Sequence, residues 1–156
     1  MKRRSIRTMF SVCGVILAWN LTAQAQEAVD FETQIQPVLT TSCAVSGCHT
    51  GETLAFGGFS GAGLILFAGQ SLEQLVGVVS KLDKDRLRVV PGNSAESLLV
   101  QKLERADGVG SGMPLGSDPL TAEMIQLIKD WIDQGALPDA PTAIGDVSWA
   151  EMKQAR

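Results

Sequence analysis

A short segment, CAVSGCH at residues 43–49, brings together two cysteines and a histidine. Two thiols can form thioether bonds to the vinyl groups of a haem, and a histidine directly after the second cysteine can bind the iron. The usual spacing for this chemistry is Cys-x-x-Cys-His, whereas four residues separate Cys43 from Cys48 here. The residue types therefore predict covalent attachment of a haem through Cys43 and Cys48, with His49 as an axial ligand, at an extended spacing.

The sequence contains a single histidine, His49, so the sixth position of the iron takes a methionine, a weaker donor or no ligand. A methionine thioether favours reduced iron, so His/Met ligation raises the reduction potential. Three methionines follow residue 25, namely Met113, Met124 and Met152. Met124 falls on the apolar face of an expected helix, where packing explains it, and Met152 lies in the tail. Met113 lies in a glycine-rich loop, and Pro114 restrains its backbone toward extended conformations. Met113 is therefore the predicted sixth ligand.

Residues 1–25 have the organisation of a cleaved secretory signal. Four basic residues in the first seven positions precede an apolar stretch over residues 9–21, and the small residues Ala23 and Ala25 suit a cleavage site. The apolar stretch is too short for a membrane anchor, which needs about 20 residues. We therefore expect export to the periplasm and no membrane span after cleavage. The expected mature chain has one domain, at residues 26–140, and a tail at 141–156 with a possible short helix.

The charge balance of the mature chain limits the classes of partner that we expect it to bind. All 17 acidic residues lie beyond residue 25, whereas four of the 13 basic residues lie before it. Nine basic residues then remain against 17 acidic ones, which gives a formal charge of −8. Nucleic acids and anionic membranes attract positive surfaces, so neither is an expected partner. The electrostatic complement is a redox partner protein with a basic docking surface.

The mature sequence predicts helices joined by loops rich in glycine and proline, with little strand signal. Asp30 is placed to cap a helix that runs into Cys43, and Pro37 predicts a kink or a fresh start within it. The clearest helix follows Thr121, a suitable N-cap, and ends before Gly135, which suits the left-handed position after a helix. These two helices flank the predicted site residues in the sequence.

Two further helices are expected between them. Ser71 with Gln74, and Asn93 with Glu96, each have the spacing of a capping box, which predicts a helix starting at each pair. The mixed-charge run at residues 81–88 predicts a solvated connection between these helices.

The order of these features resembles the small c-type cytochrome domains found alone or fused in many bacterial exported proteins, the planctomycete-type cytochrome c family. Four family motifs occur in order over residues 30–137: Phe-x-x-x-Ile-x-Pro-x-Leu, Pro-Gly-x-x-x-x-Ser-x-Leu, Met-Pro and Trp-Ile-x-x-Gly-Ala. The matching residues are Phe31, Ile35, Pro37 and Leu39; Pro91, Gly92, Ser97 and Leu99; Met113 and Pro114; and Trp131, Ile132, Gly135 and Ala136. The departure from the family pattern is the cysteine spacing, which leaves Cys48 and His49 adjacent.

The resemblance implies an all-α, class I cytochrome c-like fold with one haem and loop-rich connections, in which the first and last helices cross. Phe31 and Trp131 are candidates for an aromatic contact at that crossing, the alternative being separate core positions. The carbonyl of Pro91 can accept a hydrogen bond from the His49 ring, although we favour a simple turn there. The implied function is electron transfer through haem c held by His49 and Met113, in a free carrier or a subunit of a dehydrogenase, and not catalysis.

Two other interpretations of the site remain open from the sequence. If Met113 does not bind the iron, the sixth position is open, as in a haem enzyme subunit or a gas sensor. Without haem, Cys43 and Cys48 can form a disulfide in a small binding module. The same cysteines can also join His49 and Glu52 in a zinc site, although zinc ligands usually come in more dispersed pairs.

Overall fold

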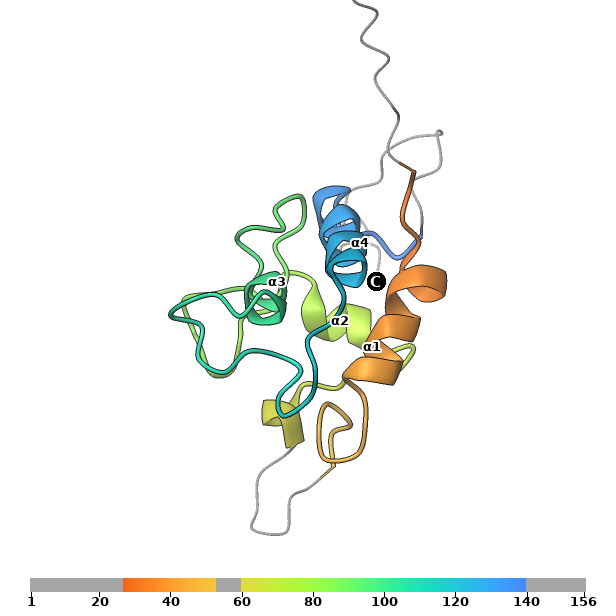
Figure 1. Ribbon diagram of the computed structural model, residues 1–156. Coiled ribbons are helices and arrows are strands. Elements are labelled where there is room, and N and C mark those ends of the chain that lie inside the picture. Colours follow the sequence, from red (N-terminus) through yellow and green to blue (C-terminus); the bar gives the residue numbers. More distant parts are fainter. Residues whose placement is uncertain (1–26, 53–59, 140–156) are drawn as a thin grey trace, which may run out of the picture.

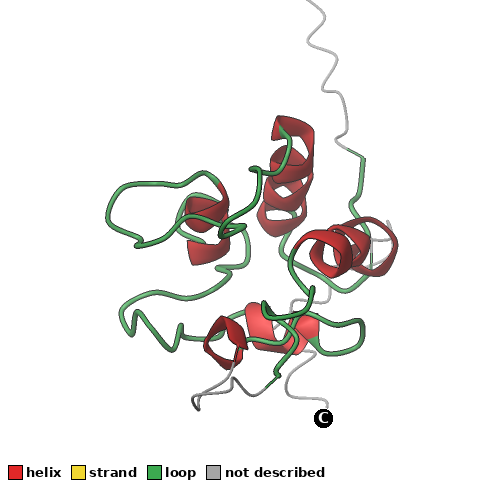
Figure 2. Cartoon of the chain, turned by 60° about the horizontal axis from the view of Figure 1, so that its bottom comes forward, coloured by secondary structure: helices red, strands yellow, loops and turns green. Residues whose placement is uncertain are grey.

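The computed structural model describes residues 27–52 and 60–139, and the regular elements in these ranges are helical (Figures 1 and 2). In chain order they are the π-helical turn η1 (Phe31–Ile35), α1 (Gln36–Ser42), the 3₁₀ turn η2 (Ser60–Gly63), α2 (Ser71–Leu75), α3 (Leu98–Leu103) and α4 (Ala122–Asp133). The class I cytochrome c-like arrangement stays a prediction. The expected signal at 1–25 and tail at 141–156 lie outside the described residues. In the described ranges, no helix is long and apolar enough to cross a membrane.

The first helical segment begins where the sequence predicts and changes its helix type beside Pro37. Asp30 caps η1, and its Oδ1 accepts a hydrogen bond of 2.8 Å from the backbone N–H of Thr33. The π-helical turn gives way to α1 at Gln36, so Pro37 falls in the first turn of α1. Proline is tolerated there because the first N–H groups of a helix have no partner within the helix. The helix therefore changes type beside Pro37, where the sequence predicts a kink or a fresh start, but it continues without a break.

The last helix, α4, matches its predicted ends. The side chain of Thr121 accepts a hydrogen bond from the N–H of Met124 at the start of α4, and Gly135 follows its end with a φ of 107°. Ile128, Trp131 and Ile132 are buried on its inner face. Met124 is 39% exposed, so its predicted place on the packed face is wrong.

The N-terminal helical segment and α4 meet through an aromatic pair. The rings of Phe31 and Trp131 lie 4.9 Å apart between centroids, tilted by 42°, which confirms the predicted aromatic contact. The Trp131 Nε1–H donates a hydrogen bond of 2.8 Å to the carbonyl of Leu137, so the buried indole has a partner. α4 also contacts α3, and Figure 1 shows α4 between α1 and α3. α4 therefore fixes the position of α3 relative to α1.

The two middle helices differ from the prediction. α2 begins one residue after Gln70, without a side-chain cap, and ends at Leu75. The Ser71 hydroxyl donates to the carbonyl of Phe67, and Gln74 Oε1 accepts from the N–H of Ile65, so the predicted capping box does not form. The second predicted box forms only in part. Its Asn93 side chain accepts from the N–H of Glu96, but α3 starts at Leu98.

The segment between α2 and α3 is irregular and held by isolated β-bridges. These join Val76 to Val89 and Val79 to Leu87. The N–H of Arg88 also donates to the carbonyl of Val78, and the carbonyl of Arg88 accepts from the N–H of Leu99. These bonds fix the backbone at Arg88 between the end of α2 and the start of α3.

Candidate haem-binding site

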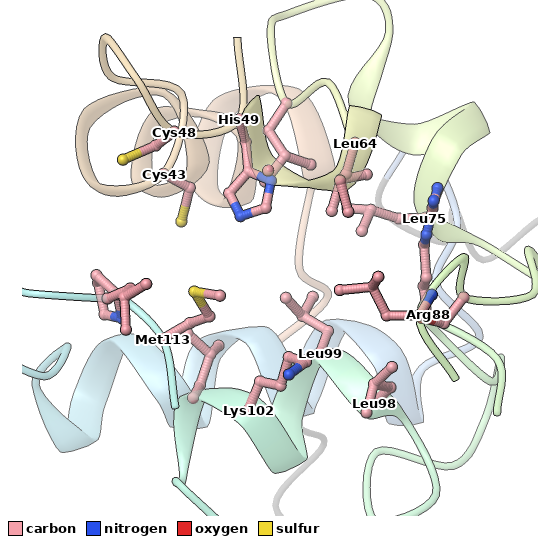
Figure 3. A pocket seen from close by; sticks show the side chains of 18 of the residues that line it. Cys43, Cys48, His49, Leu64, Leu75, Arg88, Leu98, Leu99, Lys102 and Met113 are labelled. Atoms are coloured by element: carbon pink, nitrogen blue, oxygen red, sulfur yellow. The ribbon is translucent and has the colours of Figure 1, made fainter. Parts of the chain in front are cut away.

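A cavity of about 270 Å³ lies between the Cys43–His49 loop, residues 61–66 and α3 (Figure 3). All four predicted site residues line it: Cys43, Cys48, His49 and Met113. Most of the other lining is apolar and comes from leucines on several segments, namely Leu64, Leu66, Leu75, Leu98, Leu99 and Leu103. Such a mixture of an apolar wall with a few convergent polar groups is typical of a ligand site.

The loop that carries the cysteines is closed by backbone hydrogen bonds. The N–H of His49 donates to the carbonyl of Cys43 over 3.1 Å, and the carbonyl of His49 accepts from the N–H of Leu66 over 2.9 Å. Cys43 and Cys48 are both free thiols, and neither is joined in a disulfide. Burial, with a smaller contribution from Cys48, raises the pKa of the Cys43 thiol to about 11. That thiol is therefore protonated at neutral pH.

The imidazole of His49 is held in its neutral form. Burial lowers its pKa, although the nearby backbone of Leu64 and Gly61 partly opposes the shift. A neutral imidazole has a nitrogen lone pair free to bind a metal. The Nδ1 atom is buried and has no hydrogen-bond partner of good geometry among the described residues. It faces Gly61, whose missing side chain leaves the space that the ring edge occupies.

Met113 enters the cavity from the side opposite His49 (Figure 3). α3 holds it in place, because the N–H of Met113 donates to the carbonyl of Lys102 over 2.9 Å. The ammonium of Lys102 in turn donates to the carbonyls of Val109 and Ser111, at 2.7 and 3.2 Å. Lys102 thus ties the loop before Met113 to the helix. The Met113–Pro114 peptide bond is cis.

The described residues contain no cluster of side chains of the kind that the zinc interpretation requires. In residues 27–52 and 60–139, no three or more His, Cys, Asp or Glu side chains gather where they could hold a metal ion. The carboxylate of Glu52 instead accepts a hydrogen bond of 3.1 Å from the N–H of Gly47.

Two cavity residues were not anticipated from the sequence. Gly61 was one glycine among several in a predicted loop, and nothing local marked it as the residue beside His49. Arg88 lies in the run at 81–88 that we expected to be solvated, yet only 9% of it is exposed and it lines the cavity. The solvated prediction is therefore wrong for Arg88.

The carbonyl of Pro91 does not accept a hydrogen bond from the His49 ring, because His49 Nδ1 has no partner among the described residues. Pro91 lies instead in a turn closed by the bond from the N–H of Asn93 to the carbonyl of Val90, as we favoured from the sequence.

Comparison of the chain with protein-family models, with curated proteins and with solved structures finds no match in any of the three. The functional argument therefore depends on the cavity and on the order of the sequence motifs.

Proposed function

We propose that this chain is an exported electron-transfer protein that carries one covalently attached haem c, with His49 and Met113 as axial ligands. The observation that carries the proposal is the placement of four side chains around one apolar cavity. An imidazole and a thioether enter it from opposite sides, and the thiols of Cys43 and Cys48 lie together at one end (Figure 3). These donors fit a c-type haem in number, type and arrangement.

Each of these residues has a distinct role in the proposal. Cys43 and Cys48 provide the thioether links that keep the group attached through every redox cycle. His49 provides a neutral nitrogen ligand, and Met113 provides a soft sulfur ligand that favours reduced iron. When bound, a haem c supplies a one-electron iron couple. With His49 and Met113 both on the iron, no position would remain open for a substrate, and electron transfer would be the remaining chemistry.

The surroundings of the cavity suit exchange of electrons with another protein. The leucine wall makes most of the cavity lining apolar, and burial in an apolar environment is one of the means by which a protein tunes a haem potential. Leu82 and Leu115 also line the cavity and are 81% and 66% exposed, so the cavity opens to solvent beside them. The formal charge of −8 for the mature chain favours a partner with a basic docking surface.

The test is production of the full chain in a host with an active cytochrome c maturation system. We expect a mass equal to polypeptide plus one haem, a haem stain that survives denaturing electrophoresis, and the far-red methionine-to-iron band in the oxidised protein. His49→Ala abolishes a properly ligated haem, and a double Cys43→Ser, Cys48→Ser variant abolishes covalent attachment.

The same measurements discriminate the alternatives. Covalent haem without the far-red band, together with rapid carbon monoxide binding by the ferrous protein, would favour an enzyme subunit or a gas sensor. A mass equal to polypeptide alone, or polypeptide less two hydrogens, would overturn the haem proposal and favour a disulfide-containing module.

A further inference from the structure

Arg88 is a buried cation at the end of the cavity opposite the cysteines. Figure 3 shows Cys43 and Cys48 at one end of the cavity and Arg88 at the other. Only 9% of Arg88 is exposed, and it lines the cavity together with the leucines. Its backbone is held at both N–H and carbonyl, so its side chain starts from a fixed point.

The guanidinium of Arg88 lacks an anionic partner in the described part of the chain. The ion pairs formed there are Arg86 with Asp83 and Lys129 with Glu104, and neither includes Arg88. Arg88 Nη1 donates one hydrogen bond of 2.7 Å, to the carbonyl of Gln74. Outside the described residues, the sequence has no Asp or Glu at 1–26 or 53–59, and two in the tail, Asp146 and Glu151. Burying a charge without a partner costs several kcal/mol, so a counter-charge is expected in the cavity.

We propose that Arg88 binds a propionate carboxylate of the haem, an inference that rests on the proposed function. The vinyl groups and the propionates of a haem lie on opposite edges of the ring. Thioether links at Cys43 and Cys48 fix the vinyl edge at their end of the cavity, and this directs the propionate edge toward Arg88. A guanidinium has five N–H donors in a planar fork, which suits a carboxylate.

The other cations around the cavity are less suited to this role. Lys81 is exposed, so water and salt screen its charge. Lys102 already donates to two loop carbonyls. Ser80 is a supporting candidate, because its Oγ accepts from the N–H groups of Leu82 and Asp83 and its hydroxyl proton remains to donate. Arg88 is therefore the residue on which the test should be made.

The test compares haem-loaded wild type with Arg88→Gln, Arg88→Lys and the control Arg86→Gln. Arg86→Gln is the matched control, because it removes the same charge from a residue that pairs with Asp83 and does not line the cavity. Loss of the positive charge at Arg88 stabilises ferric iron, so the reduced-to-oxidised ratio at a fixed ambient potential falls by about three- to tenfold, tenfold being about 59 mV for one electron. Arg88→Lys retains most of the wild-type ratio, and Arg86→Gln leaves it within about twofold, because a screened surface charge contributes little.

A second measurement needs no variant. In the ferrous, diamagnetic wild type, nuclear Overhauser contacts are expected between the guanidinium protons of Arg88 and the propionate methylene protons. Haem attached normally, with an unchanged ratio in Arg88→Gln and no such contact, overturns this inference alone. If Arg88→Gln does not acquire haem, the nuclear Overhauser contacts in the wild type alone test the inference: their presence supports it and their absence overturns it. A wild-type chain without covalent haem overturns the proposed function and this inference together.

Discussion

Gly61→Ala is the change that most directly tests the position of His49. A Cβ built on Gly61 would lie 2.8 Å from His49 Cε1 and 3.0 Å from the carbonyl of Cys48, and closer still to His49 Nδ1. The φ of Gly61 is 55°, a left-handed value that costs a residue with a side chain about 1–2 kcal/mol. Overpacking against the ring adds about 1–3 kcal/mol. We therefore expect unfolding free energy to fall by about 2–5 kcal/mol.

The matched control is Gly116→Ala. Gly116 has a φ of 73°, but nothing lies within 4 Å of a Cβ built on it, so this variant carries the backbone strain without the clash. Its expected loss is about 1–2 kcal/mol. Denaturant unfolding of both haem-loaded variants measures the difference, and the visible spectrum reports on the iron. Because Gly61→Ala pushes the ring away from its place, its axial bands should change while those of Gly116→Ala stay as in the wild type. Equal stability losses and unchanged spectra in both variants would refute the close packing of the His49 ring against Gly61.

Three further outcomes are expected. Met113→Ala keeps covalent haem, loses the far-red band and has a lower potential by redox titration; an unchanged spectrum would rule out Met113 as a ligand. Lys102→Met removes the hydrogen bonds to two carbonyls of the loop before Met113, which should cost about 1–3 kcal/mol of stability in denaturant unfolding. Because that loop then holds Met113 less firmly, carbon monoxide should bind the ferrous protein faster; wild-type values for both would contradict the role of Lys102. Trp131→Phe keeps a ring against Phe31 but loses volume and the indole hydrogen bond, which should cost about 1–3 kcal/mol. A cost of zero would mean that this contact is not part of the stabilising core.

Local signals in the sequence predicted the ends of the outer helices well. Asp30 and Thr121 each cap a helix by accepting a hydrogen bond from an N–H group three residues on, which is a property of the local sequence alone. The capping-box pattern at Ser71 failed because a contact distant in sequence took its place. Gln74 Oε1 accepts from the N–H of Ile65, which is nine residues earlier. A spacing rule has no information about such a partner.

In the candidate site, too, the residues that local sequence signals predict differ from those that depend on distant contacts. Cys43, Cys48 and His49 are close in sequence, so the sequence alone was enough to predict them as a haem attachment motif. Met113 was predicted by eliminating other ligands and from the family resemblance. Arg88 was missed because its neighbours at 81–88 are charged and mostly accessible, as in a solvated loop. Its backbone is bonded to Val78 and Leu99, and its side chain to the carbonyl of Gln74, so residues outside the run at 81–88 hold Arg88 in its buried place. Charge composition describes a segment, whereas burial depends on what packs against each residue in it.

The extended cysteine spacing has a simple structural account. The N–H of Cys48 donates to the carbonyl of Val45 over 2.9 Å, which closes a β-turn with Gly47, at a φ of 77°, in its third position. A left-handed third residue is the requirement that makes glycine common there. Val45 and Ser46 are exposed and do not line the cavity, so this part of the loop lies toward solvent, while the hydrogen bond from the N–H of His49 to the carbonyl of Cys43 closes the base of the loop. The closed base of the loop therefore leaves both Cys43 and Cys48 among the residues that line the cavity, which is what the haem proposal requires of a four-residue gap.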